Sequence, residues 1–311
     1  MNAHGDHVVG THGMVRAAEI PLLLPGGRRL TISGDDRDVS VVGALVSSDG
    51  NWEPHVRGLF ERLVQPDWVC LDIGANIGAH TLALACLARR VYAFEASPAN
   101  FAHLETNVAA TGMSAKITPV LAAIWDGAGT VDVVASPEFS GTAFATADGS
   151  PWDGSDHVYA LGDREVPFTF RSDTVPAVRL DDWVAEHELD RIDLIKIDVE
   201  GAEQTALAGA TETLRRFKPL LVTEYNPSAA TSLFGARPDA YFEFLADAFP
   251  SLHVIEPDGS LSEPLVEWRR LEVRLAEGRG WEDLLCVPET PAPRRGLFRP
   301  LAAAAARKLR R

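Results

Sequence analysis

Cysteine is scarce in this sequence. Its 311 residues include three cysteines, Cys70, Cys86 and Cys286, without a CxxC pair or a Cys/His spacing typical of a metal site. This usage excludes a disulfide framework and a zinc finger, and it is typical of reduced thiols in the cytoplasm. The sequence also lacks an apolar run of about 18 residues, the length that a transmembrane helix requires, and a signal-peptide pattern. We therefore expect a soluble, cytoplasmic protein.

Basic residues are also few in this sequence. Lys and Arg together number 29 against 44 acidic residues, so the net charge is −15. Neutralising nucleic-acid phosphates requires a basic face, so this balance predicts a protein that does not bind nucleic acid. The exception is a basic C-terminal tail, residues 288–311, which carries seven basic residues and one acid. We interpret this tail as a solvated end, with peripheral docking to a membrane surface or a partner as the alternative.

The order of the apolar segments predicts an α/β fold. Residues 1–67 are interpreted as an N-terminal extension of short strands and one helix, with residues 39–45 as one of the strands. Residues 68–287 alternate between strands and helices, which predicts a mostly parallel sheet with helices on both faces. Within this domain, residues 136–176 are rich in Gly, Ser, Asp and Pro. We expect them to form an insertion loop or small hairpin that faces the substrate.

The most informative segment is a buried strand that runs into a glycine-rich turn. Asp72 ends the strand, and Gly74, Asn76 and Gly78 follow before a helix begins near His80. In an open parallel sheet, ligands bind beyond the carboxyl ends of the strands, where such a turn lets backbone N–H groups approach them closely. The segment therefore predicts a nucleotide-type site, with a tight turn that binds nothing as the alternative.

Charge distinguishes between the possible ligands. A dinucleotide fingerprint would place glycine where Asn76 stands, and the anionic Asp72 suits a pyrophosphate poorly. Both features suit S-adenosylmethionine, which carries ammonium and sulfonium charges and no phosphate. Glu95 ends the next strand, where its carboxylate can accept the hydrogens of two ribose hydroxyls. Because Glu95 suits either cofactor, a nicotinamide-dependent oxidoreductase is the alternative.

A second group of carboxylates ends another apolar strand, predicted over residues 192–199. Asp198 and Glu200 lie at its end, at the sheet edge that also carries the glycine-rich turn. A carboxylate at this edge can accept a proton, orient a nucleophile or bind a hard cation. Glu203 falls in the first turn of the next helix, where capping is its favoured role. Lys196 lies inside the strand and requires a buried partner, for which a neighbouring carboxylate is the candidate.

Together these segments resemble the FkbM family of S-adenosylmethionine-dependent methyltransferases. The first segment alone indicates only a class I methyltransferase. The resemblance implies a class I, Rossmann-like fold with a seven-stranded sheet, S-adenosylmethionine as the donor, and usually O-methylation of a sugar or natural-product hydroxyl. It covers about residues 68–227 and rests on LDIGANIG at 71–78, VYAFEASP at 91–98, Asn107, LDD at 180–182, IKIDVEGAE at 195–203 and LVTE at 221–224.

The resemblance also implies roles for single residues. Asp72, Gly74, Asn76 and Gly78 would line the methionine side of the cofactor, and Glu95 would bind its ribose. The N-terminal extension, the insertion and the basic tail lie outside the shared pattern. They therefore leave the identity of the methyl acceptor and the oligomeric state open.

Methyl transfer to a hydroxyl requires a base, because an alcohol is a weak nucleophile at neutral pH. The candidates are Asp198, Glu200, Glu224 and His80, which lie at or just beyond predicted strand ends beside the cofactor turn. A bound Mg²⁺ is the less favoured alternative, and Asp198, Glu224 and Asn226 would then supply its oxygen ligands. We expect a small-molecule or glycan acceptor. A non-catalytic glycan-binding or partner-binding protein of the same fold is the remaining alternative.

Overall fold

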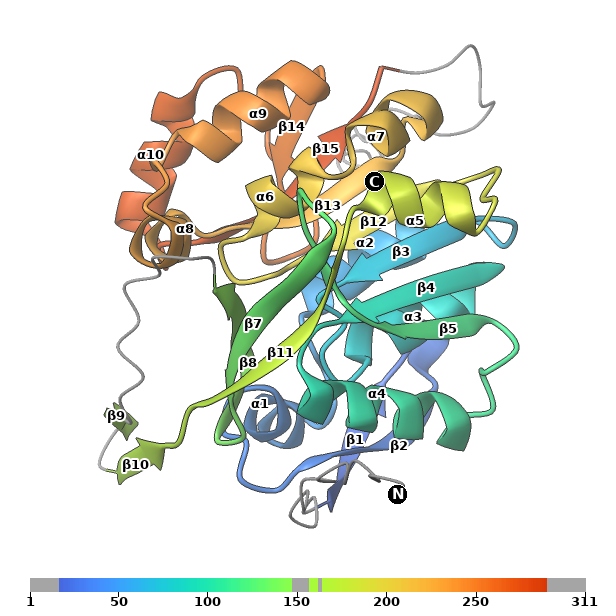
Figure 1. Ribbon diagram of the computed structural model, residues 1–311, viewed down its shortest axis with the longest axis vertical. Helices are drawn as coiled ribbons and strands as arrows, with labels where there is room; N and C mark the ends of the chain where they lie inside the picture. Colours follow the sequence, from blue (N-terminus) through green and yellow to red (C-terminus); the bar gives the residue numbers. More distant parts are fainter. Residues whose placement is uncertain (1–16, 147–156, 162–163, 290–311) are drawn as a thin grey trace, which may run out of the picture.

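A computed structural model describes residues 17–146, 157–161 and 164–289 of the chain. At its centre is a sheet of seven strands in the order β14-β15-β13-β12-β3-β4-β5 (Figure 1). Four neighbouring pairs run parallel, whereas β15 runs antiparallel to both β13 and β14, so the sheet is mixed. Its strands are β3 (Val69–Ile73), β4 (Arg90–Glu95), β5 (Ile117–Leu121), β12 (Leu194–Ile197), β13 (Leu220–Tyr225), β14 (Ser251–Val254) and β15 (Glu282–Val287).

Helices cover both faces of this sheet because its strands are apolar on both sides. On one face, α2, α3 and α4 pack against Cys70 and Leu194. On the other face, α5, α6, α9 and α10 pack against the alternate residues Leu71 and Ile195. The predicted α/β fold is confirmed. The helices are α1 (Val41–Ser47), α2 (Pro54–Leu63), α3 (Ala79–Leu87), α4 (Pro98–Ala110), α5 (Leu180–Glu186), α6 (Glu203–Ala208), α7 (Thr211–Phe217), α8 (Pro227–Phe234), α9 (Ala240–Ala248) and α10 (Trp268–Glu277).

The N-terminal extension begins with a hairpin. β1 (Ala17–Leu23) pairs antiparallel with β2 (Arg29–Asp35), and the short 3-10 helix η1 (Pro25–Gly27) lies in the turn between them. Ile20 and Ile32 carry the apolar side of this hairpin into the core that also holds α2, α3 and α4. The extension therefore shares a hydrophobic core with the main sheet.

The prediction of a strand over residues 39–45 is wrong, because α1 occupies this part of the extension. The carboxylate of Asp38 accepts hydrogen bonds from the backbone N–H groups of Ser40 (2.8 Å) and Val42 (3.1 Å). A carboxylate that satisfies the first N–H groups of a turn stabilises the start of a helix. This local interaction overrides the strand preference of the valine-rich segment.

A second sheet forms between β5 and α5. Its strands are ordered β6-β11-β7-β8, and Val133, Ala145 and Val175 form its small core. The segment 136–176, which the sequence predicts as an insertion loop or a small hairpin, is largely strand in its described residues, and β9 and β10 within it pair antiparallel. The strands are β6 (Ala123–Ile124), β7 (Gly129–Ser136), β8 (Phe139–Thr146) and β11 (Arg171–Val178), with β9 (His157–Leu161) and β10 (Arg164–Phe168) as a separate antiparallel pair.

Two predictions concern the chain's relation to membranes. In the ranges that the structure describes, no helix combines the length and the apolar character needed to cross a bilayer. Residues 290–311, nearly all of the basic tail, lie outside the described residues. The docking role of this tail therefore stays a prediction.

The helix that the sequence predicts over residues 203–217 is divided into α6 and α7 near Gly209. At this point the helical layer approaches the second sheet, because Gly209 lies against the backbone carbonyl of Trp125. A Cβ atom at Gly209 would lie 2.0 Å from that carbonyl oxygen, well inside van der Waals contact. Only glycine therefore fits this junction without a backbone shift.

We predict that Gly209→Ala lowers the free energy of unfolding by about 1–3 kcal/mol, because the new methyl group meets a backbone oxygen rather than a flexible side chain. Chemical denaturation of both proteins measures this difference. Gly127→Ala is the matched control, since a Cβ atom there would have no heavy atom within 4 Å. Equal effects of the two substitutions would show that the contact with Trp125 does not constrain the fold.

Candidate active site

A cavity of about 380 Å³ opens at the carboxyl ends of β3, β4, β12 and β13. Its wall includes the turn after β3, residues 73–77, and residues 139–143 of β8 in the second sheet. Trp52, Trp125 and Trp281 add aromatic surface. The crevice at this edge of an open α/β sheet is where such folds bind their ligands.

The turn after β3 has the close backbone approach that its glycines predict. Gly74 adopts a positive φ of 79°, and a Cβ atom there would lie 1.7 Å from the carbonyl oxygen of Asp198. Gly78 also has a positive φ, 98°, and is the N-cap of α3. The turn therefore brings the ends of β3 and β12 into direct contact. Any side chain larger than hydrogen at Gly74 would prevent this contact.

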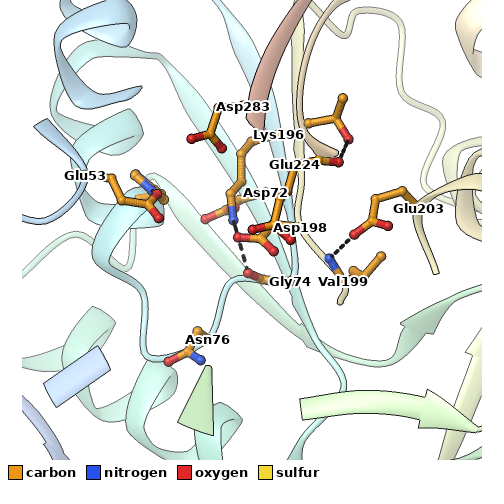
Figure 2. Close-up of polar contacts among 12 residues, drawn as sticks. Glu53, Asp72, Gly74, Asn76, Lys196, Asp198, Val199, Glu203, Glu224 and Asp283 are labelled. Atoms are coloured by element: carbon orange, nitrogen blue, oxygen red, sulfur yellow. Dashed lines mark hydrogen bonds and ion pairs between the residues drawn. The ribbon is translucent and has the colours of Figure 1, made fainter. Parts of the chain in front are cut away.

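A buried ammonium group lies beneath this turn. Lys196 of β12 is the register neighbour of Asp72 on β3. Its Nζ lies 3.3 Å from Asp198 Oδ2, 3.4 Å from the Gly74 carbonyl oxygen and 3.8 Å from Asp72 Oδ1 (Figure 2). Burial would lower the pKa of Lys196, but the carboxylates of Asp198, Asp72 and Glu53 outweigh it and raise the pKa. Lys196 thus has the carboxylate partners that a lysine inside a buried strand requires.

Asp72 and Gly78 support the turn rather than line the cavity. The Asp72 side chain is fully buried, and its Oδ2 accepts a hydrogen bond of 2.5 Å from the Thr81 hydroxyl on α3. Gly78 lies against Leu104 of α4. The structure therefore places Gly74 and Asn76 in the cavity wall and these two residues behind it.

Glu95 lies at the end of β4 and lines the cavity. Its two carboxylate oxygens accept hydrogen bonds from the backbone N–H groups of Ser97 (2.8 Å) and Asn76 (2.7 Å). Burial raises the pKa of Glu95 to about 7, and these two bonds oppose the increase. The carboxylate retains further acceptor lone pairs for a ligand, because each oxygen carries two.

Two further acidic side chains in the cavity wall are those of Glu200 and Glu224. Burial and the neighbouring carboxylate of Asp198 raise the pKa of both side chains, that of Glu224 to about 10. Glu224 Oε2 is buried and finds no hydrogen-bond partner among the described residues. Glu224 therefore favours the protonated form near neutral pH, in which a carboxyl group is not a proton acceptor.

His80, at the start of α3, also lines the cavity and pairs with a residue that the sequence analysis did not single out. Its Nε2 lies 2.7 Å from Oε2 of Glu53, just before α2. Burial would raise the pKa of Glu53, but the hydrogen bond from His80 and the charges of His80 and Lys196 together outweigh it and lower the pKa. No sequence motif marks Glu53, because 27 residues separate it from His80.

The alternative metal ligands are partly committed to other contacts. Asn226 Oδ1 accepts a hydrogen bond of 3.1 Å from the backbone N–H group of Ala229 and so caps α8. Within the described ranges, no group of three or more His, Cys, Asp and Glu side chains is arranged to hold a metal ion. Glu203 lies in the first turn of α6 and accepts hydrogen bonds from the N–H groups of Val199 and Gly201 in the turn before the helix, so its capping role stays a prediction.

One carbonyl group of the second sheet accepts a hydrogen bond from the glycine turn after β3. The Ser140 carbonyl oxygen on β8 accepts hydrogen bonds from the side-chain amides of Asn76 (3.0 Å) and Asn100 (3.2 Å). The Ser140 hydroxyl in turn donates a hydrogen bond of 2.6 Å to the buried carboxylate of Asp38. Residues from the extension, the turn and the second sheet thus form one network. No sequence motif marks this network.

The family model of the methyltransferase FkbM domain matches residues 72–252, more than half of the chain. The chain belongs to the FkbM methyltransferase family. Two relatives of this FkbM-family chain carry names that state an activity. The 2-O-methyltransferase NoeI of Sinorhizobium fredii is 31% identical over 176 residues, which are 55% of this chain and 68% of NoeI. The 31-O-demethyl-FK506 methyltransferase FkbM of Streptomyces tacrolimicus is 30% identical over 162 residues, 48% of this chain and 62% of that protein.

Solved structures of methyltransferases also match the FkbM-family chain. A methyltransferase FkbM from Methylobacillus flagellatus aligns with a TM-score of 0.42 at 17% identity, over 71% of this chain and 44% of that one. A putative methyltransferase from Streptococcus mutans, solved in complex with SAH, aligns with a TM-score of 0.41 at 10% identity, over 75% of this chain and 96% of that one.

We predict that Glu224→Gln stabilises the protein more at pH 9 than at pH 5. With a pKa of about 10 against an ordinary value of 4.5, folded Glu224 holds a proton that the unfolded chain releases between these pH values. The free energy of unfolding therefore falls as the pH rises through this window, and glutamine removes the effect. Melting temperatures between pH 5 and pH 9 measure it.

Glu105→Gln on the exposed side of α4 is the control, and it should shift the melting temperature equally at every pH. Parallel pH curves for wild type and Glu224→Gln would mean that Glu224 is ionised in the folded protein.

Proposed function

We propose that the chain is an S-adenosylmethionine-dependent O-methyltransferase that methylates a hydroxyl group of a sugar, a glycan or a natural-product small molecule. The observation that carries this proposal is the carboxylate-rich cavity at the glycine turn. The family membership and the O-methyltransferase names of two relatives support it. The proposal keeps the sequence-based assignment of Gly74, Asn76 and Glu95 to cofactor binding.

The residues of the cavity fit this donor by charge. Among its described lining residues, five side chains are carboxylates and two are basic. Glu224 presents a buried oxygen without a hydrogen-bond partner. A ligand with ammonium and sulfonium charges suits the carboxylates of Glu53 and Asp198 in this wall, whereas they would repel a pyrophosphate. The ribose hydroxyls of the cofactor would donate to Glu95, whose remaining lone pairs are free to accept them.

When bound, S-adenosylmethionine supplies a methyl group on a cationic sulfur. The protein must hold the acceptor in line with that group and take up one proton from its hydroxyl. We assign the proton-accepting role to Asp198, because its side chain reaches the cavity and lies beside the ammonium group of Lys196. The raised pKa values of Glu200 and Glu224 suit them to donate hydrogen bonds to the acceptor instead.

The decisive experiment is a calorimetric titration of the purified chain with S-adenosylmethionine, S-adenosylhomocysteine and NAD, each with and without Mg²⁺. We expect saturable binding of the first two ligands, no binding of NAD and no effect of Mg²⁺. Saturable binding of NAD alone would replace the proposal with a nicotinamide-dependent oxidoreductase. Binding of none of the three would favour a non-catalytic member of the fold.

We predict that Asp198→Asn keeps the affinity for S-adenosylhomocysteine and lowers the rate of methyl transfer by about 100-fold or more, because asparagine cannot take up the proton. Isothermal titration measures the affinity, and single-turnover methylation of an acceptor found by screening measures the rate. Asp247→Asn, on the exposed side of α9, is the matched control. Loss of cofactor binding in Asp198→Asn would make Asp198 a cofactor ligand rather than the base.

A further inference from the structure

The charges around the cavity leave one end of the donor without an obvious partner. The described lining carries five acidic side chains, namely those of Glu53, Glu95, Asp198, Glu200 and Glu224, of which Glu224, with its pKa raised to about 10, stays protonated near neutral pH. The amino-acid end of S-adenosylmethionine bears an ammonium group, which these carboxylates suit, and also a carboxylate, which they repel. A site for the whole donor therefore requires a group that donates hydrogen bonds to that carboxylate.

Lys196 is already committed to the protein. Lys196 Nζ donates hydrogen bonds to Asp198 Oδ2 and the Gly74 carbonyl oxygen, and it forms an ion pair with Asp72 Oδ1 at 3.8 Å. Its position beneath the turn binds β3 to β12. The second basic side chain among the described lining residues is His80.

His80 is held in one orientation by its surroundings. The ring packs edge-on against Phe60 at 5.6 Å between centroids, and its side chain is 7% exposed. Its Nε2 hydrogen-bonds Glu53 Oε2 at 2.7 Å. An ionised carboxylate only accepts hydrogen bonds, so Nε2 carries a hydrogen and Nδ1 is the ring nitrogen left for a ligand.

Glu53 is itself held in an uncommon backbone conformation. It has φ 32° and ψ 65°, in the left-handed region, and it is the N-cap residue of α2 without capping the helix through its side chain. Non-glycine residues in this region cost conformational energy and cluster at functional sites. The strained backbone directs the carboxylate to His80 instead of to the helix end.

We propose that His80, held by Glu53, binds the carboxylate group at the amino-acid end of S-adenosylmethionine. This inference rests on the proposed function and replaces the sequence-based assignment of His80 as a base. The imidazolium donates from Nδ1 to the ligand carboxylate, while Nε2 donates to Glu53. His80 is the binding residue, and Glu53 is a positioning residue. The N-terminal dipole of α3, the helix that His80 begins, favours an anion at the same place.

The test compares two ligands that differ by the carboxylate alone. Decarboxylated S-adenosylmethionine keeps the sulfonium and the amino group of the donor. We expect His80→Asn to weaken S-adenosylmethionine binding about 10- to 100-fold, the range of a charge-assisted hydrogen bond, and to leave binding of the decarboxylated ligand nearly unchanged. Glu53→Gln should cause a smaller loss of the same preference, because glutamine still accepts from Nε2 but carries no charge. Isothermal titration measures all affinities.

His55→Asn provides a matched control in the same protein. His55 of α2 makes the same type of contact, Nε2 to Asp283 Oδ2 at 2.7 Å, and its side chain is 11% exposed. It is not among the residues that line the cavity. Removal of this pair should lower the melting temperature as His80→Asn does, but it should leave the preference for the carboxylate-bearing ligand intact.

The remaining outcomes distinguish failure of the proposed function from failure of the role assigned to His80. If wild type binds neither S-adenosylmethionine nor S-adenosylhomocysteine, the proposed function fails and not the assignment of His80. If His80→Asn weakens both test ligands equally, His80 only supports the fold of the cavity and the inference is overturned. If this variant keeps both affinities but loses methyl transfer, His80 is the proton acceptor, and the inference is overturned as well.

Discussion

The site depends on a buried ammonium group. Lys196 holds together two segments that lie far apart in the chain: the end of β3 with the glycine turn that follows it, and the end of β12. Removing one partner of a buried ion pair destabilises a protein by more than the intact pair stabilises it. The charges of Asp72, Asp198 and Lys196 are therefore interdependent. Among the remaining carboxyl groups of the cavity, Glu53 has His80 as its partner.

Sequence reasoning succeeded where short-range physics decides the structure. Gly74 and Gly78 adopt the positive φ values that a tight strand-to-helix turn requires, and Glu95 and Asp198 lie where the strand ends of a parallel sheet place them. Each of these positions follows from an apolar strand and the few residues after it. The alternation of strands and helices likewise fixed the α/β class, because each buried strand needs a covering layer.

Sequence reasoning failed where distant segments decide the structure. Glu53 meets His80 across 27 residues, and Ser140 meets Asn76 across 64. No local pattern encodes either contact, since each depends on how the extension and the second sheet pack on the main sheet. The error at α1 has a different, local origin: its valines suit a strand, but Asp38 satisfies the first N–H groups of a helix.

The shared carbonyl of Ser140 has a consequence for the diversification of this enzyme. The second sheet supplies part of the cavity wall, and its strand β8 is hydrogen-bonded both to the glycine turn after β3 and to Asp38. If β8 were replaced by the corresponding strand of a related protein, residue 38 would have to form a hydrogen bond with the new strand. The extension and the insertion, far apart in the chain, therefore form a single exchangeable unit.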